Sequence, residues 1–459
     1  MEVTGSFQQL LGGFQCVFTT PSYQTFVCLM VGWVLSHRRR FVTELILSSG
    51  CQRTGHHSRY HRFFSHSAWL LDELCQVLAV LLIGLFAPAG IIELAVDDTL
   101  CRKRGLTLFG AGMHHDPLIS SRALKLVSWG HDWVVLGLVV RCGWAASKVW
   151  CLPIGFRLYR NRQGLTKGAQ KNRRKPGGKR TKYPPNAEHR TRPQLALELL
   201  QLLACWFPDR TFVVSGDSLY GGASVLRHLP SNMHLVSRVH FGGRLYQPAP
   251  EPAPGQRGRR RHKGAALPGM AAWADDASQP WQKLVFDQFG LHATLLVKTM
   301  RALYYTAGKD RLLTIVLVRD AVGQRPDQMF YCTLLEWDAR QILSAYASRW
   351  AIEVTFENGK QLMGLEDPAN RTVQAVQRTA PMALVLYSLV VAWFHRVGHK
   401  HVRFPDRPWY KKKQEPSFGD MLSTLRRMSW QEKFRGVLSG STLRKKVVVL
   451  LIEFASRSG

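Results

Sequence analysis

The chain has 459 residues, of which 46% are hydrophobic and 20% are charged, with 62 Lys and Arg against 31 Asp and Glu. This composition excludes a disordered chain, because the apolar fraction can bury the cores of roughly two to four domains at about 150 residues each. The formal net charge of +31 is unusual for an enzyme of small neutral metabolites and favours a polyanionic partner, with nucleic acid first and an anionic membrane surface second.

Residues 1–88 are predicted to form a helical N-terminal region that binds DNA. Basic and aromatic side chains alternate in "SHRRR" (36–40) and "RYHRFF" (59–64), a pattern that suits phosphate contact and base stacking. A solvated helix face is the alternative explanation of both stretches. The apolar run at 77–96 is interrupted by Pro88 and Gly90, so it predicts a buried helix, a turn and a strand, and no membrane partner.

The nine cysteines are scattered without the spacing of metal ligands. This distribution predicts reduced, mostly buried thiols in a cytoplasmic protein.

From residue 89 the pattern changes to alternating strands and helices, which predicts an α/β core with its first part at 89–221. A segment at 161–192 interrupts this part, and thirteen Lys or Arg lie between Arg157 and Arg192 against the single acid Glu188. Such a charge run is typical of a loop that becomes ordered on a polyanion.

The second half of the chain divides into three further predicted regions. Short β-rich runs predict an insertion domain at 222–340, and helical periodicity predicts the second part of the core at 341–398. A basic C-terminal tail follows at 399–459.

Two acidic positions follow apolar strands at the end where α/β folds place their ligand sites. Asp97 and Asp98 end "IIELAVDD", and Asp217 ends "RTFVVSGD". A strand-end Asp also serves as a turn or cap residue, so either position alone is ambiguous. Two carboxylates on neighbouring buried strands are costly without a cation, and with a third from a helix they can hold two Mg²⁺ ions about 4 Å apart.

The third carboxylate is predicted within "YASRWAIEVTFENGK" (346–360). At about 100° per residue on a helix, Tyr346, Arg349, Glu353 and Lys360 fall within an arc of about 60°. Glu357 lies near the same arc, and an ordinary solvated face would look similar. Lys360 is about 10 Å along the axis from Glu353, which suits a more distant phosphate better than a shared metal ion.

These residues resemble bacterial insertion-sequence transposases of the DDE, RNase H-like superfamily, in the insertion-sequence-four-like group. Its signature is Tyr, two residues, Arg, three residues, Glu, six residues and Lys, and "YASRWAIEVTFENGK" matches every element. The first family Asp is followed at the second position by Thr, as in Asp97-Asp98-Thr99, and "GDSLYGG" resembles the context of the second. The resemblance extends over about 90–395.

The resemblance implies an α/β fold with an RNase H-like catalytic core, a β-rich insertion between the second and third acids, and flanking helical regions. It implies that Asp97, Asp217 and Glu353 hold two Mg²⁺ ions, with Mn²⁺ as a substitute. It further implies that Tyr346, Arg349 and Lys360 contact double-stranded DNA at the transposon end. The activity implied is cleavage of the transposon ends and joining of their 3′-hydroxyls to target DNA, by a homodimer in complex with DNA. The location implied is the bacterial cytoplasm, in association with the nucleoid.

Several alternatives remain open on the sequence alone. Asp98 is a candidate for the first metal ligand in place of Asp97, since only one of two adjacent strand residues can face the site. Trp273, Trp281 and Trp337 are candidates either to stack on a flipped base or to pack in the interior. A nuclease that cuts DNA without joining it, and an inactive relic that only binds DNA, are the alternative functions.

Overall fold

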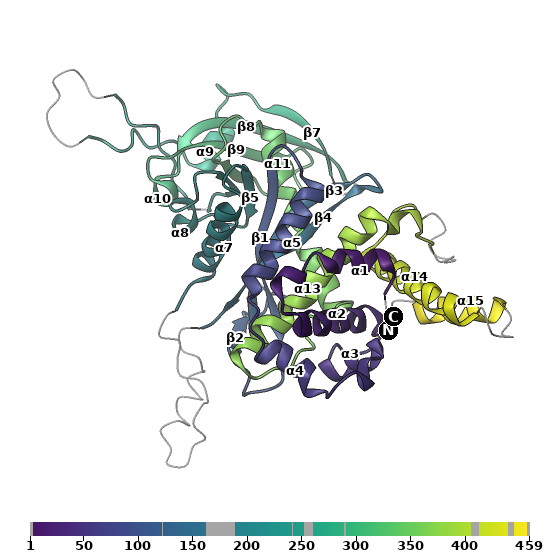
Figure 1. The fold of residues 1–459 in the computed structure, drawn as a ribbon. Helices are drawn as coiled ribbons and strands as arrows, with labels where there is room; N and C mark the ends of the chain where they lie inside the picture. Colours follow the sequence, from purple (N-terminus) through teal and green to yellow (C-terminus); the bar gives the residue numbers. More distant parts are fainter. Residues whose placement is uncertain are drawn as a thin grey trace, which may run out of the picture.

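The computed structural model describes residues 3–121, 123–161, 189–240, 242–251, 260–288, 291–404, 413–438 and 445–456. Within these ranges the fold is mixed α/β, as the alternating pattern predicted (Figure 1). Most of the basic segment expected at 161–192 lies outside the described residues.

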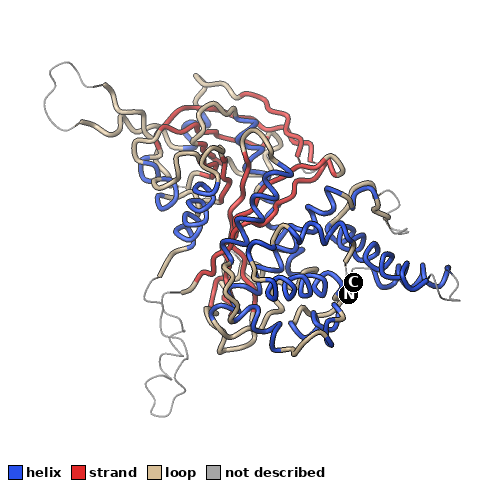
Figure 2. The backbone as a smooth tube through the Cα atoms, in the orientation of Figure 1, coloured by secondary structure: helices blue, strands red, loops and turns tan. Residues whose placement is uncertain are grey.

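One sheet runs through the middle of the molecule, drawn in red in Figure 2. Its neighbours follow the order β2-β3-β1-β5-β6-β10-β9-β8-β7, and β4 pairs with β3. The strands are β1 Ile92–Arg102, β2 Gly112–His115, β3 Val127–Cys142, β4 Ala145–Tyr159, β5 Phe212–Gly216, β6 Met233–Arg238, β7 Gln282–Gln288, β8 Leu291–Leu303, β9 Leu312–Asp320 and β10 Gln328–Cys332.

The first part of this sheet is buried because its strands are nearly continuous apolar runs. Strand β1 pairs in parallel with β5 and antiparallel with β3, and β5 pairs in parallel with β6. Parallel strands covered on both faces characteristically read as such runs rather than as an alternating pattern. The expectation that Asp97 and Asp98 end their strand is wrong, because β1 continues to Arg102 through its pairing with β3. The pairing of Val96 with Gly216 nevertheless brings Asp97 next to the end of β5, which Asp217 follows.

Helices cover the sheet on both sides (Figure 1). Helices α5 and α7 pack against β3 and β4, whereas α12 packs against β4 and β1. The helices of eight or more residues are α1 Gly5–Gly12, α2 Thr20–Leu35, α3 Val42–Ser49, α4 Ser58–Ser65, α5 Leu71–Phe86, α7 Arg192–Trp206, α11 Ala339–Ser348, α12 Trp350–Gln361, α13 Val373–Arg396, α14 Phe418–Leu438 and α15 Lys445–Ser456.

Helix α13 is the one helix in the described ranges that is long and apolar enough to cross a membrane, and 94% of its apolar window is buried inside the protein. It packs against β4, α4 and α5. This burial is what a central core helix requires. The apolar run at 77–96 forms the end of α5, a turn and the start of β1, as predicted from Pro88 and Gly90.

The N-terminal helices are part of the same core and contact the second half of the chain. The indole of Trp33 donates to the carbonyl of Met363 at 2.8 Å, and the backbone of Thr4 donates to Ser429 at 3.2 Å. A disulfide joins Cys28 in α2 to Cys51 after α3. The expectation that all the cysteines are reduced is wrong for this pair, because residues distant in sequence meet where α2 and α3 pack together.

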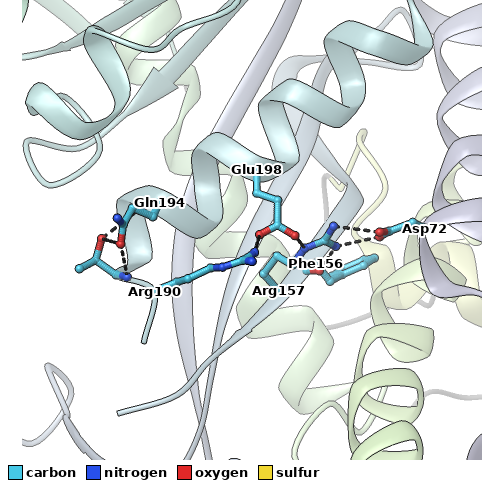
Figure 3. A network of polar contacts seen from close by, with 7 residues as sticks. Asp72, Phe156, Arg157, Arg190, Gln194 and Glu198 are labelled. Carbon is cyan, nitrogen blue, oxygen red and sulfur yellow. Dashed lines mark hydrogen bonds and ion pairs between the residues drawn. The ribbon is translucent and has the colours of Figure 1, made fainter. Parts of the chain in front are cut away.

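A network centred on Arg157 fixes α5 and α7 to the sheet (Figure 3). The guanidinium of Arg157, in β4, donates to Asp72 of α5 at 2.8 and 2.9 Å and to Glu198 of α7 at 2.7 Å. The second carboxylate oxygen of Glu198 accepts from Arg190. Because Arg157 is largely buried, its two carboxylate partners offset the cost of removing its charge from water.

The β-rich region predicted at 222–340 continues the central sheet. Strand β6 pairs with β10, and β10 pairs with β9, so β7, β8 and β9 extend one edge of the sheet that contains β1. The domain boundaries proposed from sequence stay predictions. Trp273 is buried, and Trp281 lies beneath the cations of Lys298 and Arg319.

Candidate active site

Strand β1 presents its two adjacent acids to opposite faces of the sheet, because successive side chains of a strand alternate in direction. Asp97 lies on the face covered by α12, where Arg349 contacts it. Asp98 lies on the face covered by α7, where Arg192 contacts it. The two carboxylates, adjacent in sequence, therefore pair with different arginines.

On the α12 face, a single guanidinium joins two of the predicted metal ligands. Arg349 donates through Nη1 to Asp97 Oδ2, and through Nη2 to Glu353 Oε1 at 3.1 Å. The side chain of Asp97 is 17% exposed and that of Glu353 is 36% exposed, so water and ions can reach both. The structure thus brings a strand acid and a helix acid together around one cation.

The stretch at 346–360 consists of two helices rather than one. Helix α11 ends at Ser348 and α12 begins at Trp350, so Arg349 is the junction residue, although its backbone stays in the helical region (φ −53°, ψ −33°). The four predicted residues therefore keep nearly the disposition expected on a helix. The expected continuous helix is wrong in detail, because it is divided at Arg349, the residue whose side chain contacts Asp97 of β1.

Tyr346 and Lys360 lie on either side of the pair formed by Arg349 and Glu353. The ring of Tyr346 packs 4.6 Å from that of Phe330, and the guanidinium of Arg349 lies 5.9 Å from the Tyr346 ring centre. Lys360 lies near the far end of β1. There, burial raises the pKa of the Cys101 thiol to about 12, and the charges of Lys103 and Lys360 oppose this rise.

Asp217 follows β5 and has no charged hydrogen-bonding partner among the residues described. Its Oδ1 accepts the backbone N–H groups of Leu219 at 2.8 Å and Tyr220 at 3.3 Å, which closes a tight turn after the strand. Its charge is close enough to contribute to the pKa values of both Asp97 and Asp98, in each case by raising them. The second predicted acid is therefore a neighbour of the first.

The α7 face carries a second arginine between two carboxylates. Arg192 Nε lies 3.2 Å from Asp98 Oδ2 and donates to Asp132 Oδ2 at 2.7 Å, while its guanidinium stacks 4.2 Å over the ring of Tyr159. The other oxygen of Asp98 accepts from the Tyr220 hydroxyl at 2.6 Å. The side chain of Asp132 is only 1% exposed, whereas those of Arg192 and Asp98 are 24% and 26% exposed, so the cluster is buried at Asp132 and open to water at Asp98.

Burial changes the protonation of both strand acids. It raises the pKa of Asp97 to about 7, against the opposing charge of Arg349. It raises the pKa of Asp98 to about 6, helped by the charge of Asp132 and opposed by Arg192. On each face, the charge of the single guanidinium does not fully offset the effect of burial. The pKa of each carboxyl group therefore stays above its ordinary value.

The carboxylate oxygens of Asp97 and Glu353 are the kind of ligand that a hard divalent cation prefers, and Asp217 follows the adjacent strand β5. The present arrangement differs from a formed metal site. Within the described ranges, no group of three or more His, Cys, Asp or Glu side chains is placed to hold a metal ion. Arg349 lies where a cation would have to lie between Asp97 and Glu353.

Sequence reasoning missed Asp132, Arg192 and Tyr220. Asp132 is a lone acid inside the apolar run "SWGHDWVVLGLVV", a pattern that signals a buried charge with a partner. Arg192 was counted only as one of many cations of the basic segment, and Tyr220 only as the context of Asp217. No sequence signal links the three, because they come from β3, the start of α7 and the turn after β5.

Comparison with known proteins gives one family. The family model described as DDE superfamily endonuclease matches residues 13–299, which is more than half of the chain and includes Asp97 and Asp217. Glu353 and the rest of the signature at 346–360 lie beyond the matched residues. A search of curated proteins finds no match to this sequence. By the extent of the family match, this protein belongs to the DDE superfamily of endonucleases.

Proposed function

We propose that this protein is a DNA transposase that cleaves the ends of an insertion sequence and joins them to target DNA. Membership of the DDE superfamily of endonucleases supports a nuclease that acts on DNA with divalent metal ions. The observation that carries the proposal is the approach of Asp97 and Glu353 from β1 and α12, with Asp217 at the end of the adjacent parallel strand β5.

An RNase H-like core is part of this proposal. The strand order β4-β3-β1-β5-β6, with β3 antiparallel to its neighbours and β1, β5 and β6 parallel, supports it. The β-rich segment between Asp217 and Glu353 would be the insertion of the insertion-sequence-four-like group. Its strands β7, β8 and β9 continue the sheet beyond β10.

Asp97, Asp217 and Glu353 would hold two Mg²⁺ ions, or Mn²⁺ in their place. Two such ions activate the attacking oxygen and stabilise the charge that develops on the leaving oxygen. Asp97 is preferred over Asp98 as the first ligand, because Asp97 shares the guanidinium of Arg349 with Glu353, whereas Asp98 contacts Arg192 and Tyr220 instead. Glu353 is preferred over Glu357, whose carboxylate accepts from Gln361 at 3.1 Å.

The remaining signature residues would bind the DNA strand that is cut. Arg349 has two alternative anionic partners, the carboxylates that it now contacts and a phosphate of bound DNA. Its transfer to the DNA would free Asp97 and Glu353. Lys360, near the far end of β1, would contact a phosphate further along the strand, and Tyr346 would support the position of Arg349 through ring contact.

The reaction would have two chemical steps. Water attacks the phosphodiester at the transposon end and releases a 3′-hydroxyl. That hydroxyl then attacks a phosphodiester of the target DNA, so one bond to phosphorus forms as another breaks. The N-terminal helices and the basic segment at 161–192 would bind DNA outside the catalytic site, and the chain would act as a homodimer on paired ends in the bacterial cytoplasm.

Nicking of a DNA duplex in Mg²⁺ tests the nuclease activity, and joining of a cut end to a supercoiled plasmid tests strand transfer. The substrate would come from the inverted repeats that flank the gene. We expect cleavage by the wild type and its loss in Asp217→Ala and Glu353→Ala, with DNA binding retained. Equal cleavage by all three proteins would refute the assignment of the acids.

Two further outcomes distinguish the alternative functions. Cleavage without joining would identify a nuclease. Binding of DNA without cleavage by the wild type would identify a DNA-binding relic. The high positive charge favours binding in every case, so binding alone supports neither catalytic function.

A further inference from the structure

The turn that carries Asp217 is held in place by three buried hydroxyl groups from three directions. Ser237 in β6 donates to the carbonyl of Asp217 at 2.8 Å, and Tyr331 in β10 donates to the carbonyl of Gly221 at 2.6 Å. Tyr220, which belongs to the turn itself, donates to Asp98 in β1 at 2.6 Å. Of these three contacts, only the last connects the turn to the strand that carries Asp97.

Close packing leaves this turn little freedom. The side chain of Tyr220 is fully buried, and a Cβ atom added at Gly216 would lie 2.8 Å from the Cβ of Tyr220. A Cβ atom added at Gly221 would lie 2.2 Å from the hydroxyl oxygen of Ser237. The side chain of Tyr220 therefore packs against the end of β5, and this packing fixes the position of the hydroxyl that donates to Asp98.

Asp98 is itself fixed from the other side. Its Oδ2 lies 3.2 Å from Arg192, which also pairs with the buried Asp132 of β3. Its backbone N–H donates to Asp97 Oδ1 at 2.9 Å, so any movement of Asp98 is transmitted to the adjacent acid. A continuous chain of contacts thus runs from Asp132 through Arg192, Asp98 and Tyr220 to the turn of Asp217.

We propose that Tyr220 and Asp98 are positioning residues, and that the hydrogen bond between them fixes the separation of the catalytic acids Asp97 and Asp217. The inference rests on the proposed function for its catalytic consequence. Neither residue touches the reacting atoms. Their contribution is geometric, since two carboxylates that share metal ions must be held to within a fraction of an ångström.

The substitution Tyr220→Phe tests this directly, because it removes one oxygen atom and keeps the packed ring. We expect a fall of about 10- to 100-fold in kcat for Mg²⁺-dependent nicking, typical of the loss of a contact that orients a metal ligand. The KM for DNA should change less than threefold, since the residues proposed to bind DNA are untouched. Tyr387→Phe, which removes another buried tyrosine hydroxyl from α13, is the matched control and should leave kcat unchanged.

A double-mutant cycle with Asp98→Asn tests whether Tyr220 and Asp98 act through the hydrogen bond between them or independently of each other. The amide oxygen of Asn can still accept from Tyr220, so Asp98→Asn should lower kcat less than Asp97→Asn. Addition of Tyr220→Phe to Asp98→Asn should cost less than it does in the wild type, because the shared contact is already weakened. Full additivity, or loss of activity in Asp98→Asn as complete as in Asp97→Asn, would overturn the proposal.

Hydrogen exchange provides a readout that does not depend on activity. We expect the amides of residues 217–221 to exchange at least about tenfold faster in Tyr220→Phe than in the wild type, with no such change in Tyr387→Phe. A wild type without nuclease activity would refute the proposed function. The exchange rates would still show whether the hydrogen bond between Tyr220 and Asp98 holds the turn in place. Unchanged exchange in the turn would refute the positioning role of this hydrogen bond, even if cleavage is confirmed.

Discussion

The two faces of strand β1 carry the same motif with different exposure. On each face one arginine lies between two carboxylates, Arg349 between Asp97 and Glu353, and Arg192 between Asp98 and Asp132. On the α12 face the carboxylates are 17% and 36% exposed, whereas on the α7 face Asp98 is 26% exposed and Asp132 only 1% exposed. The first arrangement has two carboxylates that water can reach, and the second is anchored at one acid that is fully buried.

This difference explains how two adjacent aspartates can have separate roles. Loss of Arg192 would leave the buried charge of Asp132 uncompensated, so this arginine is expected to stay in place. On the α12 face both carboxylates can be rehydrated, so they can accept a different cation. Catalysis with exchangeable metal ions is therefore expected on the α12 face, and positioning on the α7 face.

The largest expected effect is the difference between Asp97→Asn and Asp98→Asn in Mg²⁺-dependent nicking. Loss of a metal ligand removes several kcal/mol of transition-state stabilisation, so Asp97→Asn should lower kcat by at least about a thousandfold. Asp98→Asn should lower it by no more than about a hundredfold. Single-turnover cleavage of a labelled duplex measures both, and a reversed order would assign the first ligand to Asp98.

Next in size is the loss of stability when each arginine is removed. Arg192→Ala leaves the buried Asp132 without its guanidinium partner and only the imidazole of His114 beside it, at 3.6 Å, so the free energy of unfolding should fall by about 3 kcal/mol. Arg349→Ala should cost about 1 kcal/mol, because water can reach the freed carboxylates. Urea denaturation in the presence of a chelator measures both changes.

A double variant controls for general damage at Arg192. Asp132→Asn combined with Arg192→Met removes both charges, so it should recover most of the lost stability. Equal losses in Arg192→Ala and Arg349→Ala would show that the two faces do not differ as their exposure suggests.

A smaller effect is expected in metal binding without DNA. If Arg349 competes with metal ions for Asp97 and Glu353, Arg349→Ala should bind Mn²⁺ about tenfold more tightly than the wild type, although it binds DNA more weakly. Electron paramagnetic resonance of free Mn²⁺ gives the affinity. Arg141→Ala is the matched control, since Arg141 pairs with Glu93 at the start of the same strand at 2.8 Å. Unchanged or weaker Mn²⁺ binding in Arg349→Ala contradicts the competition.

The smallest expected effect is the pH dependence of that affinity. Burial raises the pKa of Asp97 to about 7, and a carboxyl group must lose its proton to bind a metal ion. Below pH 7 the proton competes with the metal, so Mn²⁺ affinity should rise by about tenfold at most between pH 6 and pH 8 and level off above. Isothermal calorimetry at both values measures it. Asp97→Asn should bind more weakly and lose the dependence, and a flat profile in the wild type would argue against Asp97.

Part of the site was predictable from sequence because its residues obey local rules. An acid at the end of an apolar strand and a cluster spaced for one helix face are visible in "IIELAVDD", "RTFVVSGD" and "YASRWAIEVTFENGK". The structure brings Asp97, Arg349 and Glu353 into contact and Asp217 close by. Their catalytic roles stay predictions. The junction at Arg349 escaped the helical periodicity, because a one-residue interruption with helical dihedral angles leaves the spacing nearly intact.

Other features could not be predicted because they depend on contacts between distant segments. The disulfide between Cys28 and Cys51 requires the packing of α2 on α3. The contacts of Arg192 and Tyr220 with Asp98 require that α7 and the turn after β5 meet the same face of β1. The spacing of residues in the sequence does not predict such contacts, because strands that are neighbours in the sheet are not consecutive in the chain.

The sequence by itself determined the large positive charge, the α/β alternation and the positions of the candidate acids, because composition and periodicity are local properties of the chain. Only the tertiary structure decided that Asp97 faces Glu353 while Asp98 faces Asp132. Alternation along a strand guarantees that adjacent residues point to opposite faces. Which helix covers which face depends on how the whole sheet is assembled, and that assembly gives each aspartate its partners.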